Sequence, residues 1–381
     1  MNSTIFSVIL LLVLNALELV VGQVQTRPYS CVLPSACRDS GNIIDPRILS
    51  PNGGIFPSAG VSSGVGSTGP GTGPPGNFPG SGNPVVSIVT PGQQQTDCPA
   101  GYVRCTNVIC GTPTVQPSPQ DGFATPNAFP WQAFLRNNNN LNFRNGYAGG
   151  GVLIDQYHVL TAAHKITNLT SISVSLGVYN TSFVNTQTSQ VQQAWIHSNY
   201  NQTYLKNDVA ILRLATPVNL GGNVLPICLP QAGRSFIGSP SSSCIVSGWG
   251  QTSFQTNDAP TQTLKQVHVP IVTNQQCTTS YNNVLGSVNT AAYLDFPNEI
   301  CAGGQAQQDA CTQDGGSPLV CADSGTQYTL AGLVLWGKNC GQAGVYGVYL
   351  NVPQYANWIQ CVVQCIQNTQ NCNSCPAYRF L

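Results

Sequence analysis

The chain has 381 residues, of which only 7% are charged, and its 13 Lys and Arg balance 13 Asp and Glu. This scarcity of charge argues against a basic nucleic-acid-binding protein and against a charge-rich coiled coil. Hydrophobic residues make up 41% of the chain, enough for a sizeable core, and the length allows more than one domain. Sixteen cysteines, an even number, favour an oxidising compartment in which disulfides stabilise the fold.

Residues 1–22 have the features of a secretory signal peptide. Residues 5–21 form an apolar run that only Asn15, Glu18 and other small or polar side chains interrupt, and Val20 and Gly22 suit a signal peptidase. A membrane anchor is the alternative, but the run is short for a bilayer and no Lys or Arg flanks it. The sequence therefore predicts a secreted, extracellular protein without a membrane anchor.

Composition divides the rest of the chain into three parts. Residues 23–110 hold the first cysteines, and within them residues 48–96 contain no charged residue and are rich in Gly and Pro. Such a stretch cannot bury enough apolar surface to fold, so it is predicted to be a flexible tether. Residues 111–362 have the composition of a globular domain, and residues 363–381 form a cysteine-containing tail.

Residues 111–362 contain short apolar or alternating runs separated by Gly, Asn and Pro turns, a pattern typical of antiparallel barrels and sandwiches. Only residues 353–363 place their apolar side chains at helical spacing. An all-β domain closed by one C-terminal helix is therefore predicted. The predicted strands lie in residues 151–160, 171–178, 208–214, 244–249, 267–272 and 328–336.

Four motifs, in a fixed order, identify a family that this domain resembles. They are Phe129-Pro130-Trp131-Gln132, the segment ending in Thr161-Ala162-Ala163-His164, Asn207-Asp208-Val209-Ala210, and Asp314-Gly315-Gly316-Ser317-Pro318. In this order the motifs resemble those of the chymotrypsin-like serine proteases, over about residues 110–362. The resemblance implies a chymotrypsin-like double β-barrel with the catalytic cleft between the barrels.

The resemblance also implies a triad in which a serine attacks, a histidine accepts its proton and a buried aspartate orients the histidine. His164 and Asp208 match the histidine and the aspartate, but Gly315 occupies the serine position. Ser317 lies two residues further on, too far for the contact of about 3 Å that proton transfer to the histidine requires. The triad is therefore predicted to be degenerate, and the protein is predicted not to be an enzyme.

Two further departures from the family affect other steps of the mechanism. By the resemblance, Gln313 replaces a glycine whose N–H helps to form the oxyanion hole, and a bulky side chain there can stop this N–H from pointing into the hole. No Lys or Arg lies between Cys105 and Leu135, so the activating cleavage expected near residues 118–121 lacks a basic site. Asp314, which would pair with the new amino terminus, must then be solvated or otherwise paired.

The specificity pocket of the family has matches at Asp309, Gly337 and Gly347. One interpretation is a cleft that still holds a basic side chain; the other, which we favour, is a relict carboxylate in a collapsed pocket. Leu335 replaces the usual serine beside Trp336 and is expected to crowd the site.

The resemblance assigns eight of the cysteines, while Gly149 and Lys165 replace the bridge around the His164 loop. The rear group Cys361, Cys365, Cys372 and Cys375 could bind zinc, but a secreted context without nearby His favours disulfides, so no metal or cofactor is expected. The implied pairs are Cys110–Cys228, Cys244–Cys321, Cys277–Cys301 and Cys311–Cys340.

The front cysteines carry a second resemblance. Cys31, Cys37, Cys98 and Cys105, with the intervening Gly41-Asn42-Ile43-Ile44-Asp45, resemble the clip domain of arthropod protease cascades. Arg104 takes the place of one cysteine of the adjacent pair that ends that module, so the module is degenerate and interrupted by the tether. The alternative is a leader held by disulfides that has no recognition role.

Together these features predict a secreted, inactive serine protease homologue. It would act as a regulatory cofactor or scaffold in an extracellular cascade, by resemblance an innate immune or melanisation cascade, with proteases, zymogens or pattern-recognition proteins as partners. The alternatives are a residually active serine endopeptidase and an adhesive matrix protein. N-glycosylation is predicted at the Asn-x-Ser/Thr sequences of Asn168, Asn180 and Asn201.

Overall fold

The computed structural model describes residues 30–32, 103–105, 109–139, 146–167, 170–182, 186–251, 260–323, 326–367, 375 and 378–380. The predicted signal peptide and the predicted tether lie outside these residues. So do Cys37, Cys98, Cys372 and the glycosylation candidate Asn168.

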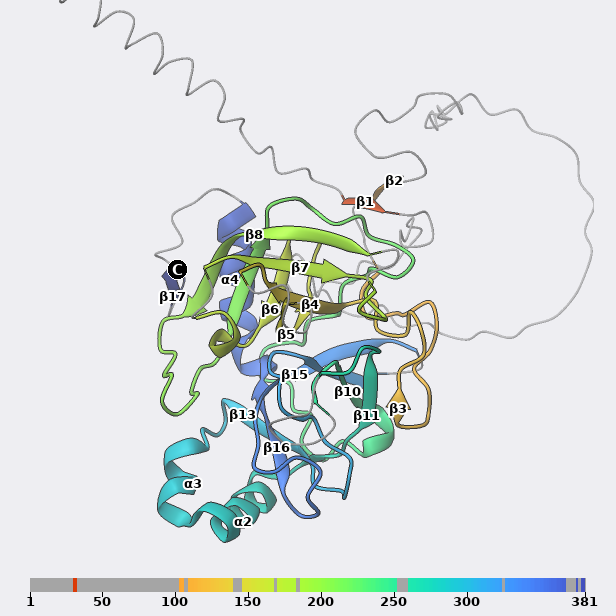
Figure 1. The fold of residues 1–381 in the computed structure, drawn as a ribbon. Coiled ribbons are helices and arrows are strands. Elements are labelled where there is room, and N and C mark those ends of the chain that lie inside the picture. The colour runs from red at the N-terminus through yellow and green to blue at the C-terminus, as the bar shows by residue number, and fades with distance from the viewer. Residues whose placement is uncertain are drawn as a thin grey trace, which may run out of the picture. The chain divides into compact units, whose positions relative to one another are not determined.

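The first half of the globular domain is a closed six-stranded antiparallel barrel (Figure 1). Its neighbours run in the order β8-β7-β4-β5-β6-β9, and the pairing of β8 with β9 closes the ring. Most side chains of these strands are buried, which suits strands that line a barrel interior. The strands are β4 (Gln132–Asn137), β5 (Tyr147–Leu153), β6 (His158–Thr161), β7 (Ile172–Leu176), β8 (Gln187–His197) and β9 (Ala210–Leu214).

The second half is an eight-stranded antiparallel sheet in the order β12-β13-β16-β15-β14-β10-β11-β3. Only Val269 and Pro270 separate β11 from β12, although these strands lie near opposite ends of the sheet. The sheet must therefore curl round on itself as a second barrel. Its strands are β3 (Gly122–Phe123), β10 (Cys244–Gly248), β11 (Lys265–His268), β12 (Ile271–Val272), β13 (Glu299–Gly303), β14 (Pro318–Ala322), β15 (Tyr328–Trp336) and β16 (Tyr346–Asn351).

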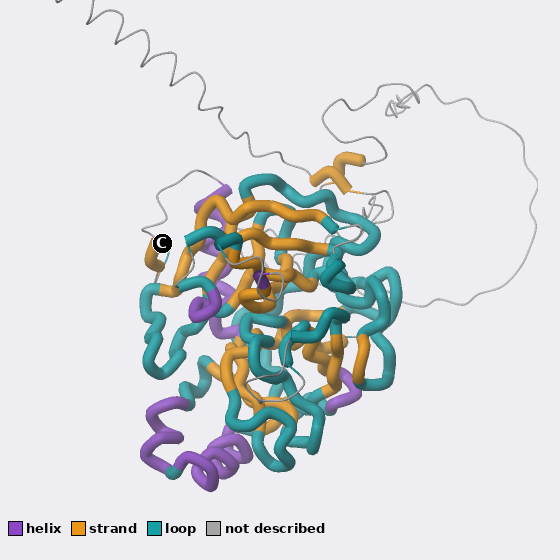
Figure 2. Tube along the Cα trace, in the orientation of Figure 1, coloured by secondary structure: helices purple, strands orange, loops and turns teal. Residues whose placement is uncertain are grey.

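Buried contacts join the two halves. The Ser247 hydroxyl of β10 donates a buried hydrogen bond of 2.7 Å to Gln132 of β4, and the Trp249 ring packs edge-on against Phe134 at 5.2 Å. Gly150 of β5 donates its N–H to the carbonyl of Gly315, just before β14. The all-β double-barrel prediction is confirmed, and most of the chain that Figure 2 colours is strand and loop.

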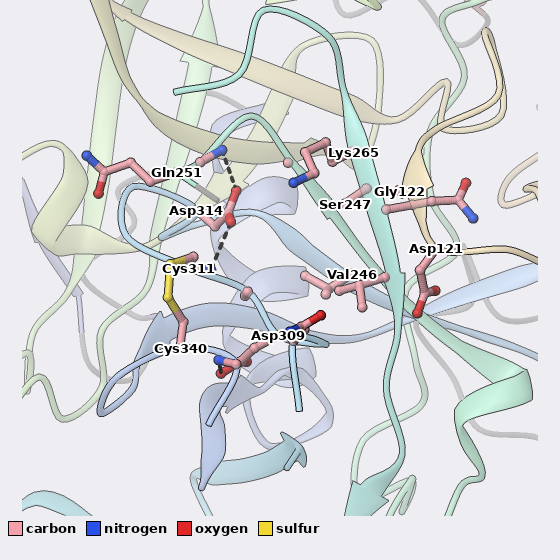
Figure 3. Close-up of a pocket in the computed structure, with 17 residues that line it drawn as sticks. Asp121, Gly122, Val246, Ser247, Gln251, Lys265, Asp309, Cys311, Asp314 and Cys340 are labelled. Atoms are coloured by element: carbon pink, nitrogen blue, oxygen red, sulfur yellow. Dashed lines mark hydrogen bonds between the residues drawn. A yellow bond between two sulfur atoms is a disulfide. The ribbon is translucent and has the colours of Figure 1, made fainter. Parts of the chain in front are cut away.

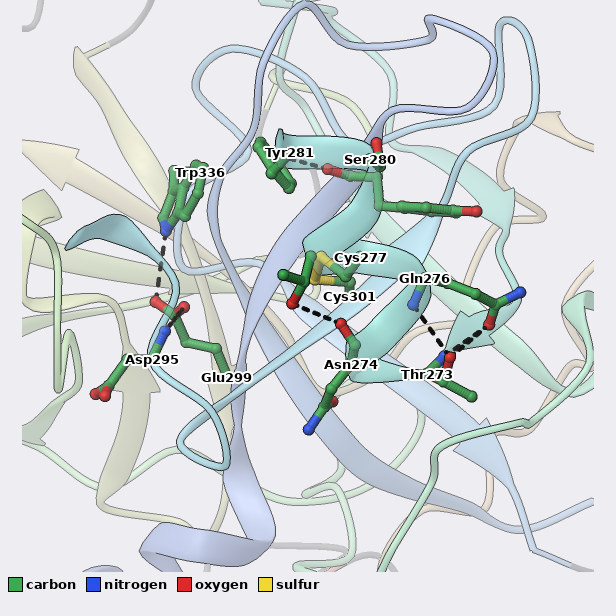
Figure 4. Close-up of a disulfide and its surroundings, with 12 residues drawn as sticks. Thr273, Asn274, Gln276, Cys277, Ser280, Tyr281, Asp295, Glu299, Cys301 and Trp336 are labelled. Carbon is green, nitrogen blue, oxygen red and sulfur yellow. Dashed lines mark hydrogen bonds between the residues drawn. A yellow bond between two sulfur atoms is a disulfide. The ribbon is translucent and has the colours of Figure 1, made fainter. Parts of the chain in front are cut away.

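The prediction of a single helix is wrong. α4 (Val352–Gln367) lies where the C-terminal helix was predicted and extends further, but α2 (Asn274–Leu285) and α3 (Ser287–Tyr293) were missed. Their Asn, Gln, Ser and Thr residues show no strong helical pattern, because few of their side chains face the core. A capping box between Thr273 and Gln276 begins α2, and a disulfide from Cys277 holds it (Figure 4).

Two strand predictions were too coarse. Residues 151–160 form the end of β5, a turn and β6, and residues 267–272 form β11 and β12 with a break at Pro270. Proline has no N–H to donate to a sheet, which explains the break. In the first case the Asp155 carboxylate accepts the N–H groups of Tyr157 and His158 and so makes the turn.

The C-terminal residues return to the first barrel. Buried Tyr355, Trp358 and Ile359 of α4 belong to the core that the first barrel dominates. After α4 a disulfide links Cys361 with Cys375, and β17 (Tyr378–Phe380) pairs with the end of β8. The predicted boundary at residue 362 therefore falls inside a helix.

One small sheet joins residues from either side of the predicted tether. β1 (Ser30–Val32) pairs with β2 (Val103–Cys105), so that Cys31 lies opposite Arg104 and Ser30 opposite Cys105. The segments that resemble a clip domain are thus brought together although about 70 residues separate them.

Candidate active site and family membership

Strand pairing brings His164 and Asp208 together. β6 and β9 are antiparallel with Thr161 opposite Ala210, so residues just after β6 meet residues just before β9. Asp208 is fully buried and accepts two bonds from the histidine, from its backbone N–H at 2.8 Å and from Nδ1 at 2.6 Å. This arrangement fixes the imidazole and leaves Nε2 free of the carboxylate.

Gly315 lies next to Nε2 of His164, whereas Asp208 binds Nδ1. A Cβ built on Gly315 would stand 2.8 Å from His164 Nε2 and 3.0 Å from its Cε1. The carbonyl of Gly315 accepts the Gly150 N–H at 3.1 Å, which fixes the turn against β5. The histidine therefore faces a position that carries no side chain.

Ser317 is fully buried. Its Oγ lies so close to Gly150 that a Cβ there would overlap it, and it is 3.0 Å from a Cβ built on Gly248. Ser317 also anchors the chain through its backbone, with its N–H bonded to the Asp314 carbonyl and its carbonyl to Val334. The hydroxyl is thus enclosed by β5 and β10.

Gln313 adopts a left-handed backbone conformation, with φ of 76°. This region favours glycine because a Cβ is crowded there. The side-chain Oε1 of Gln313 is buried and has no hydrogen-bond partner within the described ranges. Gln313 is therefore an unfavourable residue at the position where the family resemblance places glycine.

Asp314 is buried and paired within the chain. Its Oδ1 accepts the Gly250 N–H at 2.7 Å and its Oδ2 accepts the Cys311 N–H at 3.0 Å (Figure 3). Burial raises the pKa of Asp314 above its ordinary value, while these N–H donors and the cations Lys165 and Lys265 act against that rise.

A cavity of about 280 Å³ opens beside Asp314, bounded also by Asp309 and Lys265 (Figure 3). Of the predicted pocket residues, Asp309 lines this cavity, whereas Gly337 and Gly347 do not. The full lining is Asp121, Gly122, Val246, Ser247, Gly248, Gly250, Gln251, Lys265, Gln266, Val267, Gln307, Asp309, Ala310, Cys311, Asp314, Cys340 and Gly341.

The predicted pocket-floor carboxylate is enclosed. Asp309 accepts the Gly341 N–H at 3.2 Å, and its other oxygen is buried, without a hydrogen-bond partner among the residues described. A Cβ built on Gly347 would lie 2.9 Å from that oxygen, so a side chain at position 347 would crowd the carboxylate. Burial raises the pKa of Asp309 to about 7.

Aromatic side chains crowd the neighbourhood of the cleft. Leu335 is buried, and Trp336 packs against Tyr281 at 5.1 Å and Tyr293 at 5.9 Å. The Trp336 indole N–H reaches Glu299, whose buried carboxyl has its pKa raised to about 8 (Figure 4). Sequence reasoning missed Tyr281 and Tyr293, because both lie on the unpredicted helices.

The segment where activating cleavage was considered is held on the surface of the second barrel. Gln266 donates to the carbonyls of Ser118 and Gln120, at 2.7 and 3.2 Å. Asp121 accepts the N–H of His268 at 2.9 Å and lies 2.7 Å from its Nδ1. Residues 118–121 are therefore part of the ordered fold.

The cysteines are bonded in the described part of the chain, where none is free. Cys361, Cys365 and Cys375 are disulfide-bonded, so none of these three described members of the rear group is a thiolate that could bind zinc. In the same ranges no group of three or more His, Cys, Asp or Glu could hold a metal ion. The structure forms Cys110–Cys228, Cys244–Cys321, Cys277–Cys301 and Cys311–Cys340.

Two of the predicted glycosylation sites are described. Asn201 is exposed, and its side-chain oxygen accepts the N–H groups of Thr203 and Tyr204. Asn180 is half-buried and its amide nitrogen donates to Thr263 at 3.1 Å.

No helix in the described ranges is both long and apolar enough to cross a bilayer.

Comparison with known proteins agrees with this architecture. The family profile described as Trypsin matches residues 122–359. The chain is 37% identical to the inactive CLIP domain-containing serine protease A3 of Aedes aegypti over 299 residues, which cover 74% of this chain and 59% of that relative. It is 35% identical to protein masquerade of Drosophila melanogaster over 241 residues, covering 61% of this chain and 22% of that protein.

A third relative, phenoloxidase-activating factor 2 of Galleria mellonella, is 32% identical over 254 residues, covering 63% of this chain and 82% of the relative. The chain thus spans about three fifths of the Aedes relative and about a fifth of masquerade. These relatives match the clip-domain protease homologues that the sequence resembles. The chain belongs to the trypsin family.

Proposed function

We propose that this chain is a catalytically inactive protease homologue that works by binding, as a regulatory cofactor or scaffold in an extracellular proteolytic cascade. The observation that carries the proposal is Gly315 beside the His164–Asp208 pair. The base and its orienting carboxylate are in contact, but the position next to Nε2 offers neither a hydroxyl nor a thiol. Without a nucleophile the acyl-enzyme route is closed.

Ser317 does not supply the missing group in this proposal. Its hydroxyl is enclosed against Gly150 and Gly248, and its backbone is held by two hydrogen bonds. To reach His164 it would have to break these contacts and cross the turn that Gly315 occupies. Hydrogen-bond contact of about 3 Å is a condition for general-base catalysis.

The proposal also removes the need for activating cleavage. Asp314 has hydrogen-bond donors in Gly250 and Cys311, and residues 118–121 lack a basic cleavage site. We take Asp309, Gly337 and Gly347 as a relict pocket, because one Asp309 oxygen is buried without a hydrogen-bond partner among the described residues, and Gly337 and Gly347 do not line the cavity beside it. An inactive scaffold requires neither activating cleavage nor an open specificity pocket.

The regulatory role is supported by the names of the relatives, which include an inactive clip-domain protease and a phenoloxidase-activating factor. We extend this to the whole chain as four parts: signal peptide 1–22, clip-like module 23–110 with its tether, a protease-like domain from residue 111 to the end of α4 at Gln367, and the tail that follows. Partners are then extracellular proteases, zymogens or pattern-recognition proteins. Secretion and glycosylation at Asn168, Asn180 and Asn201 belong to the same proposal.

A direct test of inactivity uses the purified full chain, with and without trypsin treatment followed by trypsin removal. We expect no continuous turnover of Arg, Lys or Phe esters and no fluorophosphonate labelling of a serine, because loss of the nucleophile typically lowers turnover about a millionfold. An active trypsin-family protease serves as the positive control. Stoichiometric labelling of Ser317 would support the residually active endopeptidase instead.

The regulatory role is tested in a reconstituted cascade that contains an activating protease and prophenoloxidase. We expect the full chain to change the yield of active phenoloxidase in proportion to its concentration, while an unrelated protein at equal concentration does not. Failure in every cascade tested, together with binding to extracellular matrix, would favour the adhesive-protein alternative.

A further inference from the structure

Lys165 takes up the space that the missing nucleophile leaves. It ends the short helix η3 (Ala163–Lys165), directly after His164. A Cβ built on Gly315 would overlap Lys165 Cε, and the same point lies 2.8 Å from His164 Nε2. Lys165 Cε and His164 Nε2 therefore both lie within 3 Å of the point where a Gly315 side chain would begin.

Two glycines make this path possible. A Cβ built on Gly149 would lie 2.9 Å from Lys165 Cδ and 3.0 Å from its Cγ, closer than ordinary packing allows. Gly149 and Lys165 stand where the family resemblance places a disulfide around the histidine loop. The Lys165 stem packs over Gly149, and its Cε packs beside Gly315. A side chain at either glycine would therefore displace the lysine.

Burial disfavours the charged form of the Lys165 amine. Burial lowers the pKa of Lys165, although the carboxylates of Asp314 and Asp208 attract its charge and act in the opposite direction. A deprotonated lysine is a nucleophile, and burial is one way in which proteins activate it. Lys165 is nevertheless partly exposed, and His164 beside it has 23% of its side chain exposed.

We propose that Lys165 is a covalent acceptor site for activated esters, and that it reacts once without turnover. The amine nitrogen attacks the ester carbonyl carbon and forms a C–N bond. The C–O bond to the leaving alcohol then breaks, and the proton lost by the amine passes through His164 Nε2 to that alcohol. The products are a lysine amide and a free alcohol, with no oxidant, reductant or metal involved.

The chemistry explains why the site would stop after one reaction. A serine acyl ester can be hydrolysed by water that the histidine activates, but an amide is a far poorer acyl donor. The chain would therefore retain the acyl group at Lys165.

The experiment uses the full chain and p-nitrophenyl acetate at pH 7.5, with release of p-nitrophenolate followed optically and peptides mapped by mass spectrometry. We expect a burst near one equivalent and acetylation of Lys165 at least about tenfold faster than of the other lysines. The chain supplies its own internal controls, since its only other lysines are Lys206, Lys265 and Lys338.

Two variants sharpen the test. Lys165→Arg keeps a long aliphatic stem but removes the nucleophilic amine, so the burst should disappear, while Lys338→Arg should leave it unchanged. Equal labelling of all four lysines in the unchanged chain, or a burst that persists in Lys165→Arg, would overturn the inference. Either of these results would overturn the Lys165 inference alone. Failure of the proposed function would instead appear as continuous turnover or as acylation of a serine.

Discussion

Asp314 and Gly250 are joined by a hydrogen bond of 2.7 Å from the glycine N–H to the buried carboxylate. The contact ties the loop after β10 to the turn that carries Gly315, and the Cys311 N–H completes the pairing of the carboxylate. The turn beside the candidate site is thus held by the protein's own backbone.

This close approach predicts that Gly250→Ala destabilises the protein. The added Cβ would overlap Asp314 Cγ and stand 2.6 Å or less from both carboxylate oxygens. Overpacking of this kind costs about 1–3 kcal/mol, measured as a lower free energy of unfolding in urea. Gly337→Ala is the matched control, because only the Gly347 Cα lies within 4 Å of its Cβ, at 3.8 Å. Equal effects of the two substitutions would contradict the account.

Gln313→Gly is expected to stabilise the protein. A left-handed residue with a Cβ costs about 1 kcal/mol or more relative to glycine, and the substitution also removes the unpaired Oε1. Chemical denaturation at neutral pH measures the gain. Gln308→Gly, at a position outside the left-handed set, should instead lower stability through chain entropy.

Gly315→Ser alone is expected to leave the protein without appreciable esterase activity. The new side chain would have to displace Lys165 Cε, and Gln313 stays at the position next to Asp314. Adding Gln313→Gly and the pair Gly149→Cys and Lys165→Cys frees the space and offers the bridge that the family resemblance implies. Activity is measured with Arg, Lys and Phe esters. Robust turnover from the single substitution would show that neither Lys165 nor Gln313 obstructs the site.

The stability of the protein should depend on the ionisation of Asp309. Burial raises its pKa to about 7, whereas an unfolded Asp titrates at about 3.9, so between these values the folded chain binds more protons. The contribution of Asp309 to stability is therefore greatest below about pH 4 and declines as the pH rises to about 7.

Asp309→Asn should flatten this decline and make the protein more stable than the unchanged chain at pH 8, by on the order of 2 kcal/mol. The amide oxygen can still accept the Gly341 N–H. Urea denaturation at pH 4 and pH 8 checks the prediction, and the two proteins should differ little at the lower pH. A difference independent of pH would point to packing rather than ionisation.

The sequence alone determined the family, the double barrel and the candidate site positions. These features rest on short motifs, such as Thr161-Ala162-Ala163-His164 and the residues around Gly315. Each motif is contiguous in the sequence, so it can be recognised without knowing which residues are in contact. His164 follows β6 and Asp208 precedes β9, so the antiparallel pairing of these two strands brings the two residues together. The C-terminal helix was visible because its buried residues recur at helical spacing.

Tertiary structure alone decided the rest, because it depends on contacts between residues far apart in the chain. α2 was hidden because mainly Cys277 and Tyr281 face the core, and its Thr273–Gln276 capping box was the one local pattern that could have revealed it. The Asp314–Gly250 bond joins residues 64 positions apart. Lys165 could be read from the sequence only as a lost cysteine; that it fills the space at Gly315 follows from the packing of β5, η3 and the turn before β14.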